Sequence, residues 1–272
     1  MQLYSRGWGT GVEDRGTSKL VPIAGDVKIV GLFFKGLGDV TGRPTDELTL
    51  QRGRGVTGDV HANVGSPRQV LIASAPYLEQ LGLEPGELQE NIVLGGAVEL
   101  IGSGRVLQLG QSAWVRLTFL CEPCAYLERV QPGLVKRSKG KRGMLGMVIR
   151  DGVVRQGDLA TVLPQQFPVL SERVSDRFTE FVSRIPSGRV VNTTNLLLAL
   201  GVTPSYYRTI PSFLKRAAAD VPIHRVVAAD GSLLSRHLPQ QLQRLQAEGI
   251  NVVDQHVSAL YYWEPIHFHD LQ

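Results

Sequence analysis

AWVRLTFLCEPC, residues 113–124, contains the two features that decide how this chain folds and where its chemistry is expected. Its first eight residues are rich in β-branched and aromatic side chains and lie between turn residues, which predicts a β-strand. The CEPC that follows holds Cys121 and Cys124, the only cysteines in 272 residues. Two cysteines cannot supply a disulfide framework, so the fold is expected to depend on apolar burial. The two thiols are therefore candidates for chemistry.

Six further runs of the same kind extend the strand pattern from residue 27 to residue 163. They are VKIVGLFF (27–34), RQVLIAS (68–74), ENIVLGG (90–96), VLQLG (106–110), MLGMVI (144–149) and LATVL (159–163). Short strands at this spacing predict a β-rich barrel or sandwich. One helix is expected within it, because Ser74 and Pro76 form a start signal and Gly82 an end signal.

The pattern changes at LPQQFP, residues 163–168, which we take as the domain boundary. Next, SERVSDRFTEFVSRI carries apolar residues at steps of three and four, which predicts an amphipathic helix opened by Ser171. Further helices are expected over 194–200, from Pro204, and over 239–249. We predict an irregular arm over 1–26, a strand-rich domain over 27–163, a linker over 164–168 and a mainly α-helical, winged-helix-like domain over 169–272.

Composition places the chain among soluble globular proteins, with 43% hydrophobic and 20% charged residues. No apolar run approaches the roughly 18 residues of a membrane span, and the N-terminus lacks the order of a signal peptide, so we expect a cytoplasmic protein without membrane contact. The net charge is +4. Residues 129–150 contain seven basic and no acidic side chains. This segment predicts an anion site, with a solvated basic loop as the alternative.

The strand-rich half also places polar side chains close together in sequence. GDVHANVGSPRQV contributes Asp59, His61 and Arg68, and ENIVLGG begins with Glu90 and Asn91. Beside them, Cys124 follows a proline near the basic segment and is a candidate thiolate nucleophile or soft ligand of a transition metal. The alternatives are a redox pair with Cys121 and an inert buried thiol. A structural zinc site is not expected, because it needs four ligands.

The order of motifs in this half resembles the MOSC domain, named after the C-terminal part of molybdenum cofactor sulfurases. The motifs are GDVHA (58–62), RQV (68–70), LGLEPGELQENIV (81–93), EPC (122–124), PGL (132–134) and RGMLGMVIRDGVVRQGD (142–158). The resemblance implies a β-rich fold that binds the molybdenum cofactor (molybdopterin) or carries sulfur on cysteine. Some small bacterial members reduce N-hydroxylated bases with the bound cofactor.

The same resemblance implies roles for individual residues. Cys124 would be the molybdenum ligand or the persulfide carrier. His61 and Asn91 would line the pocket as catalytic residues. The candidates for holding the cofactor and its phosphate are Arg68, Lys139, Lys141 and Arg142.

The second half resembles the DNA-binding domain of alkylguanine-DNA alkyltransferases and their alkyltransferase-like relatives. The motifs are IPSGRVVNTTNLLLALGVTPSYYR (185–208), VPIHRVVAADGSLL (221–234) and LQAEGINVV (245–253). The resemblance implies that Arg208, in the second helix of a helix-turn-helix, fills the space left by a flipped base. His224, Arg225 and Glu248 match the residues that surround the reactive cysteine in the enzymes.

Several positions depart from that enzyme pattern. The cysteine that accepts the alkyl group is replaced by Ile223, whose side chain has no lone pair to attack an alkyl group, so alkyl transfer is excluded. Thr193 stands where the enzymes carry a tyrosine, and the segment between Arg208 and Pro222 is shorter. Residues 168–272 hold ten basic and nine acidic side chains, a smaller excess than nucleic-acid modules usually show. A structural remnant and an active DNA reader therefore both stay open.

These observations predict a molybdenum-cofactor-binding or sulfur-carrying protein that acts on modified or N-hydroxylated nucleobases. Its second domain would recognise nucleic acid or a base without catalysis. As an enzyme it would be a molybdenum-dependent reductase or a sulfur transferase that needs no pyridoxal phosphate, with an electron-donor or sulfur-donor protein as partner. The alternative is a non-enzymatic DNA-lesion-binding protein, linked to DNA repair, whose first half is a sulfur-relay or docking module.

Overall fold

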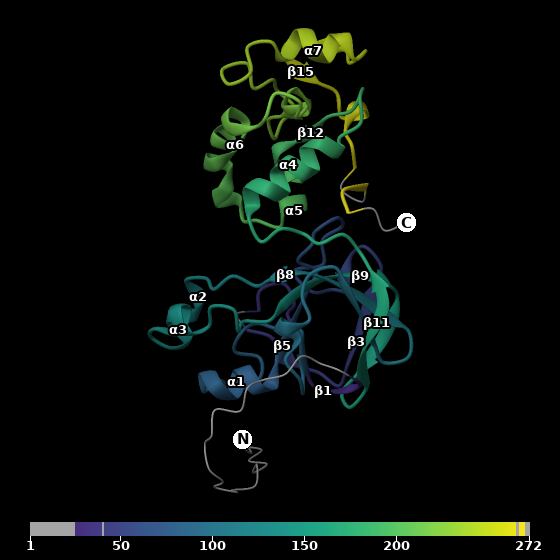
Figure 1. Cartoon of the computed structure of the whole chain (residues 1–272), viewed down its shortest axis with the longest axis vertical. Helices are drawn as coiled ribbons and strands as arrows, with labels where there is room; N and C mark the ends of the chain where they lie inside the picture. Colours follow the sequence, from purple (N-terminus) through teal and green to yellow (C-terminus); the bar gives the residue numbers. More distant parts are fainter. Residues whose placement is uncertain (1–24, 40, 265–266, 270–272) are drawn as a thin grey trace, which may run out of the picture.

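The computed structural model describes residues 25–39, 41–264 and 267–269. Most of the predicted N-terminal arm, residues 1–24, lies outside the described residues. From Val27 to Gln166 the chain forms a closed β-barrel, drawn in the lower half of Figure 1. Its strands are β1 (Val27–Phe34), β5 (Val70–Ser74), β6 (Ile92–Leu94), β7 (Arg105–Leu109), β8 (Ala113–Leu120), β9 (Met144–Arg150) and β11 (Leu159–Gln166).

All seven predicted strands are present, and the predicted β-rich class is confirmed. The strand order is β11-β7-β8-β9-β5-β6-β1, and β1 pairs with β11 to close the barrel. Every pair is antiparallel except β5 with β6. A parallel pair requires a crossover, and α1 (Ala75–Leu81) lies within it. β5 is buried along its whole length, which explains why VLIAS has no polar alternation.

Short strands that the apolar runs did not indicate extend the barrel domain. β3 (Glu47–Gln51), β4 (Gly55–Val56) and β10 (Gly152–Arg155) form a second sheet, and β2 (Arg43–Pro44) pairs with β1. In β3, ELTLQ alternates between exposed and buried positions. With only two apolar residues it forms too short a run to stand out from the surrounding loop.

The helix predicted inside the barrel is confirmed at both ends, although Ser74 does not cap it with a hydrogen bond. Gly82 ends α1 in the left-handed conformation, with φ of 70°. Ser74 occupies the N-cap position but makes no capping hydrogen bond. Its hydroxyl instead donates to the buried Glu99 and accepts from the Val98 backbone, in the 3₁₀ helix η1 (Val98–Leu100). After β8 come α2 (Tyr126–Val130) and α3 (Leu134–Arg137).

The second domain is helical, as predicted. Its elements are α4 (Val174–Arg184), β12 (Val191–Asn192), α5 (Thr193–Leu200), η2 (Pro204–Thr209), α6 (Ile210–Arg216), η3 (Ile223–Arg225), β13 (Val226–Val227), α7 (Gln241–Ala247), β14 (Val252–Val253), β15 (His256–Val257) and η4 (Ala259–Tyr261). Ser171 does not open α4. Its hydroxyl accepts from the Arg173 backbone and donates to Asp176, so the helix begins at Val174.

The two domains are joined by a continuous apolar core. β11 runs to Gln166, into the predicted 164–168 linker, because Gln166 still pairs with Arg105 across an irregularity that accommodates Pro164. Phe119 and Cys121 of the barrel belong to the same buried cluster as Phe178 of α4. In Figure 1 the helical half lies on the end of the barrel near β8 and β9.

Buried polar contacts also cross the boundary. Arg116 of β8, 3% exposed, donates to the backbone oxygens of Pro168 (2.8 Å) and His269 (3.2 Å). Burial lowers the pKa of His269 to about 3, so its ring is neutral, and it packs edge-on against Phe181 at 4.9 Å. His269 is thus a packing residue.

Candidate functional site

A small pocket of about 50 Å³ lies in the barrel domain at the boundary with the second domain. The residues that line it are His61, Arg68, Leu71, Gln89, Asn91, Cys121, Arg142 and Leu145. The structure therefore brings together four of the predicted site residues, which come from segments up to 81 positions apart in the sequence. The volume suits one small group, such as a phosphate, rather than a whole pterin.

Asp59 organises one wall of this pocket. Its Oδ1 accepts from the Nδ1 of His61 (3.0 Å), and its Oδ2 accepts from the Lys35 backbone (2.9 Å) and the Asn91 amide (3.0 Å). Burial raises the pKa of Asp59, but these hydrogen bonds outweigh burial, so its pKa lies below the ordinary value. The ionised carboxylate fixes the tautomer of His61 and leaves Nε2 as the atom that can exchange a proton at the pocket.

Asn91 has no hydrogen left for a ligand. Its amide donates to Asp59 and to the Phe33 carbonyl (3.4 Å), and its Oδ1 accepts from the Leu71 backbone (3.1 Å). The side chain is 3% exposed. The predicted catalytic Asn91 thus positions the wall that carries His61.

Arg142 provides the strongest indication of a ligand in the pocket. It is 6% exposed, and its Nη1 donates to the Glu122 carbonyl at 2.5 Å. Its Nε has no hydrogen-bond partner among the described residues. A buried donor without a partner costs about 1–3 kcal/mol, so this guanidinium needs an acceptor. Arg68 lines the same pocket, and two guanidinium groups predict an anionic acceptor.

The two thiols occupy different environments. Cys121 is buried and lines the pocket, whereas Cys124 is exposed and is not among the lining residues. Burial raises the pKa of Cys121, and the charges of Arg142 and Arg68 act in the opposite direction. The prediction placed the ligand or persulfide role on Cys124, with a redox pair with Cys121 as an alternative. The alternation along β8 does not indicate Cys121, because Leu117, Thr118 and Phe119 are all buried and the pairing with β9 is irregular between Leu117 and Leu120.

The predicted lysines do not reach this pocket. Lys139 is exposed after α3. Lys141 lies against α1, where its ammonium is 5.8 Å from the ring of Tyr77 and 3.4 Å from Gln80. The turn that precedes β9 directs neighbouring basic residues to different sides, so only Arg142 of this segment points inward.

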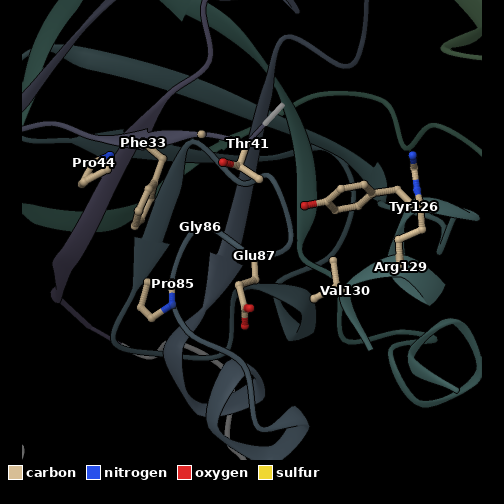
Figure 2. A pocket seen from close by; sticks show the side chains of 10 residues that line it. Phe33, Thr41, Pro44, Pro85, Gly86, Glu87, Tyr126, Arg129 and Val130 are labelled. Carbon is tan, nitrogen blue, oxygen red and sulfur yellow. The ribbon is translucent and has the colours of Figure 1, made fainter. Parts of the chain in front are cut away.

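A larger groove of about 540 Å³ lies on the other side of the loop that carries Gln89 and Asn91. Figure 2 shows Phe33 and Pro44 on one side of it and Tyr126 on the other. The Arg129 guanidinium lies 5.6 Å from the centroid of the Tyr126 ring. Gly86 is required behind Phe33, because a Cβ there would come within 2.9 Å of the ring. Aromatic walls and a guanidinium suit a flat heteroaromatic ligand.

Within the described part of the chain, no three His, Cys, Asp or Glu side chains converge in a way that could hold a metal ion. Over the same residues, no helix combines the length and apolar character needed to span a bilayer.

The second candidate site centres on Glu248 at the end of α7. Its carboxylate accepts from His224 Nε2 (2.7 Å), from Arg225 Nη2 (2.8 Å) and from the Gly188 backbone (3.0 Å). Burial raises the pKa of Glu248, but the hydrogen bonds from Arg225 and His224 outweigh it and lower the pKa to about 2. The predicted cluster is assembled, and Ile223 lies directly before it in η3. The cluster connects the end of α7 to η3 and to the backbone at Gly188, but it has no nucleophile.

An apolar pocket of about 230 Å³ lies in the same domain. Its walls include Thr193, Tyr207 and Leu214. Arg208, which follows Tyr207, is exposed, but it lies in the 3₁₀ helix η2 rather than in the predicted second helix, because Pro211 starts the regular helix later.

A second groove, of about 760 Å³, begins where this apolar pocket ends. It shares Pro211 and His237 with the pocket. It is also lined by Lys215, Arg216 and Arg236. An apolar pocket beside basic side chains suits a base and its phosphate.

Comparison with known families assigns both halves. Residues 54–161 match the model of the MOSC domain. Residues 173–250 match the model of the 6-O-methylguanine DNA methyltransferase DNA-binding domain. No curated protein shows a significant match to this chain.

Solved structures resemble parts of this chain. The YuaD protein from Bacillus subtilis is 20% identical, with 53% of this chain and 97% of that chain covered and a TM-score of 0.45. YiiM from Escherichia coli is 19% identical, with 70% and 92% covered and a TM-score of 0.41. S. pombe Atl1, in complex with damaged DNA containing O6-carboxymethylguanine, is 24% identical, with 35% and 98% covered and a TM-score of 0.31.

Proposed function

We propose that this chain is a cytoplasmic molybdenum-cofactor protein that reduces modified nucleobases. The proposal starts from the match of its barrel half to the MOSC domain and of its helical half to an alkyltransferase-type DNA-binding domain. The observation that carries the proposal is the pocket that combines the Cys121 thiol, an oriented histidine and a buried guanidinium whose Nε lacks an acceptor among the described residues. Two free thiols suit a reducing compartment.

The residues of the pocket fit the anionic part of such a cofactor. Arg142 and Arg68 would hold its phosphate, which supplies the acceptor that Arg142 Nε lacks. Cys124 is the accessible thiol and would bind molybdenum or carry sulfur, with the buried Cys121 behind it. When bound, the cofactor supplies the two electrons that reduction of an N–O bond consumes.

The protein itself would supply proton transfer and substrate orientation. Reduction of an N-hydroxylated base takes up two protons and releases water. His61, whose side chain is 46% exposed and held by Asp59, can deliver one of these protons through Nε2. The groove between Phe33 and Tyr126 would hold the flat base.

Metal and pterin analysis tests this proposal. The protein would be produced in a host that makes the cofactor and analysed for molybdenum and for pterin fluorescence, beside Cys124→Ser and Cys121→Ser. Loss of molybdenum in Cys124→Ser with retention in Cys121→Ser is expected. Unchanged molybdenum in Cys124→Ser would reject Cys124 as ligand, and the reverse pattern would transfer the role to Cys121. A protein without either signal would reject the cofactor.

Non-enzymatic recognition of DNA lesions is the second candidate function. The intact Glu248 cluster without a nucleophile favours it, since such a site binds without reacting. Salt-sensitive binding to alkylated duplex DNA, lost in Arg208→Ala, is expected, because Arg208 would occupy the base stack. Arg236→Ala, in the basic groove, should weaken binding less and reduce its salt dependence. No binding at low salt would remove DNA as a partner.

A further inference from the structure

One side chain of the barrel pocket is held by the other domain. Arg68 lines the pocket, and its Nη1 donates to the backbone oxygen of Gly201 at 3.2 Å. Gly201 ends α5 in the left-handed conformation, with φ of 66°. Unsatisfied carbonyls at a helix C-terminus carry partial negative charge, so they are good acceptors for a guanidinium.

Gly201 can approach the barrel only because it has no side chain. A Cβ at this position would lie 2.7 Å from Phe119 Cζ, 2.7 Å from Pro67 Cγ and 3.3 Å from Arg68 Cγ. Two of these three contacts are shorter than packed carbon atoms allow, so any side chain would separate α5 from the barrel.

A second arginine, from the helical domain, also contacts the end of α5 and the barrel. Arg177 of α4 is 2% exposed, and its Nε donates to the Leu200 oxygen at 3.0 Å. Its guanidinium lies 4.2 Å from the centroid of the Phe119 ring. The end of α5 is thus fixed by arginines from both domains.

We infer that the Gly201 carbonyl positions Arg68 for anion binding, so that the barrel pocket is complete only when the second domain is docked. This inference rests on the proposed function in one respect, namely that the pocket holds an anion. A free arginine side chain samples many rotamers, and the hydrogen bond to the Gly201 oxygen limits Arg68 to those in which it lines the pocket together with Arg142 and Cys121. Arg68 touches the ligand, and Gly201 acts through Arg68.

The experiment measures binding of inorganic phosphate to the full chain by isothermal titration calorimetry. Arg68→Gln and Gly201→Ala should each raise Kd about tenfold or more, the effect of losing a charged hydrogen bond. In the Arg68→Gln background, Gly201→Ala should add nothing. Gly249→Ala and Gly82→Ala are matched controls, because both glycines follow a helix with φ near that of Gly201 and neither has an atom within 4 Å of the added Cβ. They should bind phosphate like the wild type.

The outcomes separate this inference from the proposed function. If Gly201→Ala binds phosphate as tightly as Gly249→Ala, or if its effect adds to that of Arg68→Gln, the positioning role is rejected while the molybdenum analysis stands. If the wild type does not bind phosphate, or Arg68→Gln does not weaken binding, the anion pocket itself is rejected.

If Gly201→Ala does not fold, phosphate binding by Arg68→Lys tests the inference instead. One ammonium cannot both contact Gly201 and face the pocket with a fork of donors, so weakened binding supports the inference and wild-type binding overturns it.

Discussion

At the residue scale, a carboxylate organises each candidate site, and its partners decide which charge state is stable. Asp59 and Glu248 accept several hydrogen bonds each, and their pKa values are lowered in spite of burial. Glu99 has the opposite balance. Its Oε1 has no partner among the described residues, and burial raises its pKa to about 7 despite the hydrogen bond from Ser74.

Glu248→Gln should destabilise the second domain at neutral pH. The folded pKa of about 2 lies below the unfolded value, so Glu248 contributes stability above the unfolded pKa, and this is lost as pH falls toward 2. The contribution at pH 7 is about 3 kcal/mol. Urea unfolding of both proteins at pH 7 and pH 3 measures it, and the variant should differ less from the wild type at pH 3. A difference independent of pH would contradict the ionic origin.

Glu99→Gln should have the reverse effect. The pKa of Glu99 is about 7 in the folded protein and lower in the unfolded chain, so wild-type stability falls as pH rises from the unfolded pKa through the folded pKa. Glutamine carries no charge, so the variant does not lose stability in this way. The variant should be more stable than the wild type at pH 8 by up to about 3 kcal/mol, with the advantage disappearing near pH 4. Thermal unfolding across pH measures this. A variant less stable at pH 8 would show that Glu99 is ionised without cost.

At the element scale, the sequence predicts the strands and helices well but not how their ends meet. The seven barrel strands and the helix ends at Gly82 and Gly201 follow from apolar runs and glycine positions. The pocket does not follow, because Arg142 points inward and Lys141 outward from adjacent positions, and only the tertiary turn before β9 decides this. For the same reason the sequence could not distinguish the buried Cys121 from the exposed Cys124.

The groove beside α2 makes a prediction at this scale. Tyr126→Ala removes one aromatic wall and should weaken binding of a planar base such as an N-hydroxylated purine about 10-fold, since base–aromatic stacking is worth roughly 1–3 kcal/mol. Tyr77→Ala, on the neighbouring helix α1 and outside the groove, is the control. Fluorescence titration measures both variants. Equal affinity for Tyr126→Ala and the wild type would place the base elsewhere.

At the scale of the whole molecule, the two domains share a core rather than a flexible connection. The buried cluster includes Leu71 and Phe119 of the barrel with Phe178 and Leu197 of the helices. Arg116 and Arg177 add hydrogen bonds and a stacking contact at the same boundary. Motif order indicates two domains and their approximate limits, but this interface also depends on Arg116, Phe119 and Phe178, which lie outside the quoted motifs.

A shared core predicts that the two domains unfold together. Calorimetry of the wild type should show one transition, because separating the domains would expose Phe119, remove the ring contact of Arg177 and break the hydrogen bond from Arg116 to His269. Phe119→Ala removes the ring under Arg177 and should lower stability by about 3–5 kcal/mol and divide the transition in two. Phe33→Ala, which removes a ring from a separate apolar cluster of the barrel domain, should also destabilise the protein but leave a single transition at a lower temperature. Two resolved transitions in the wild type would contradict the shared core, and would remove the basis for the control of Arg68 by Gly201.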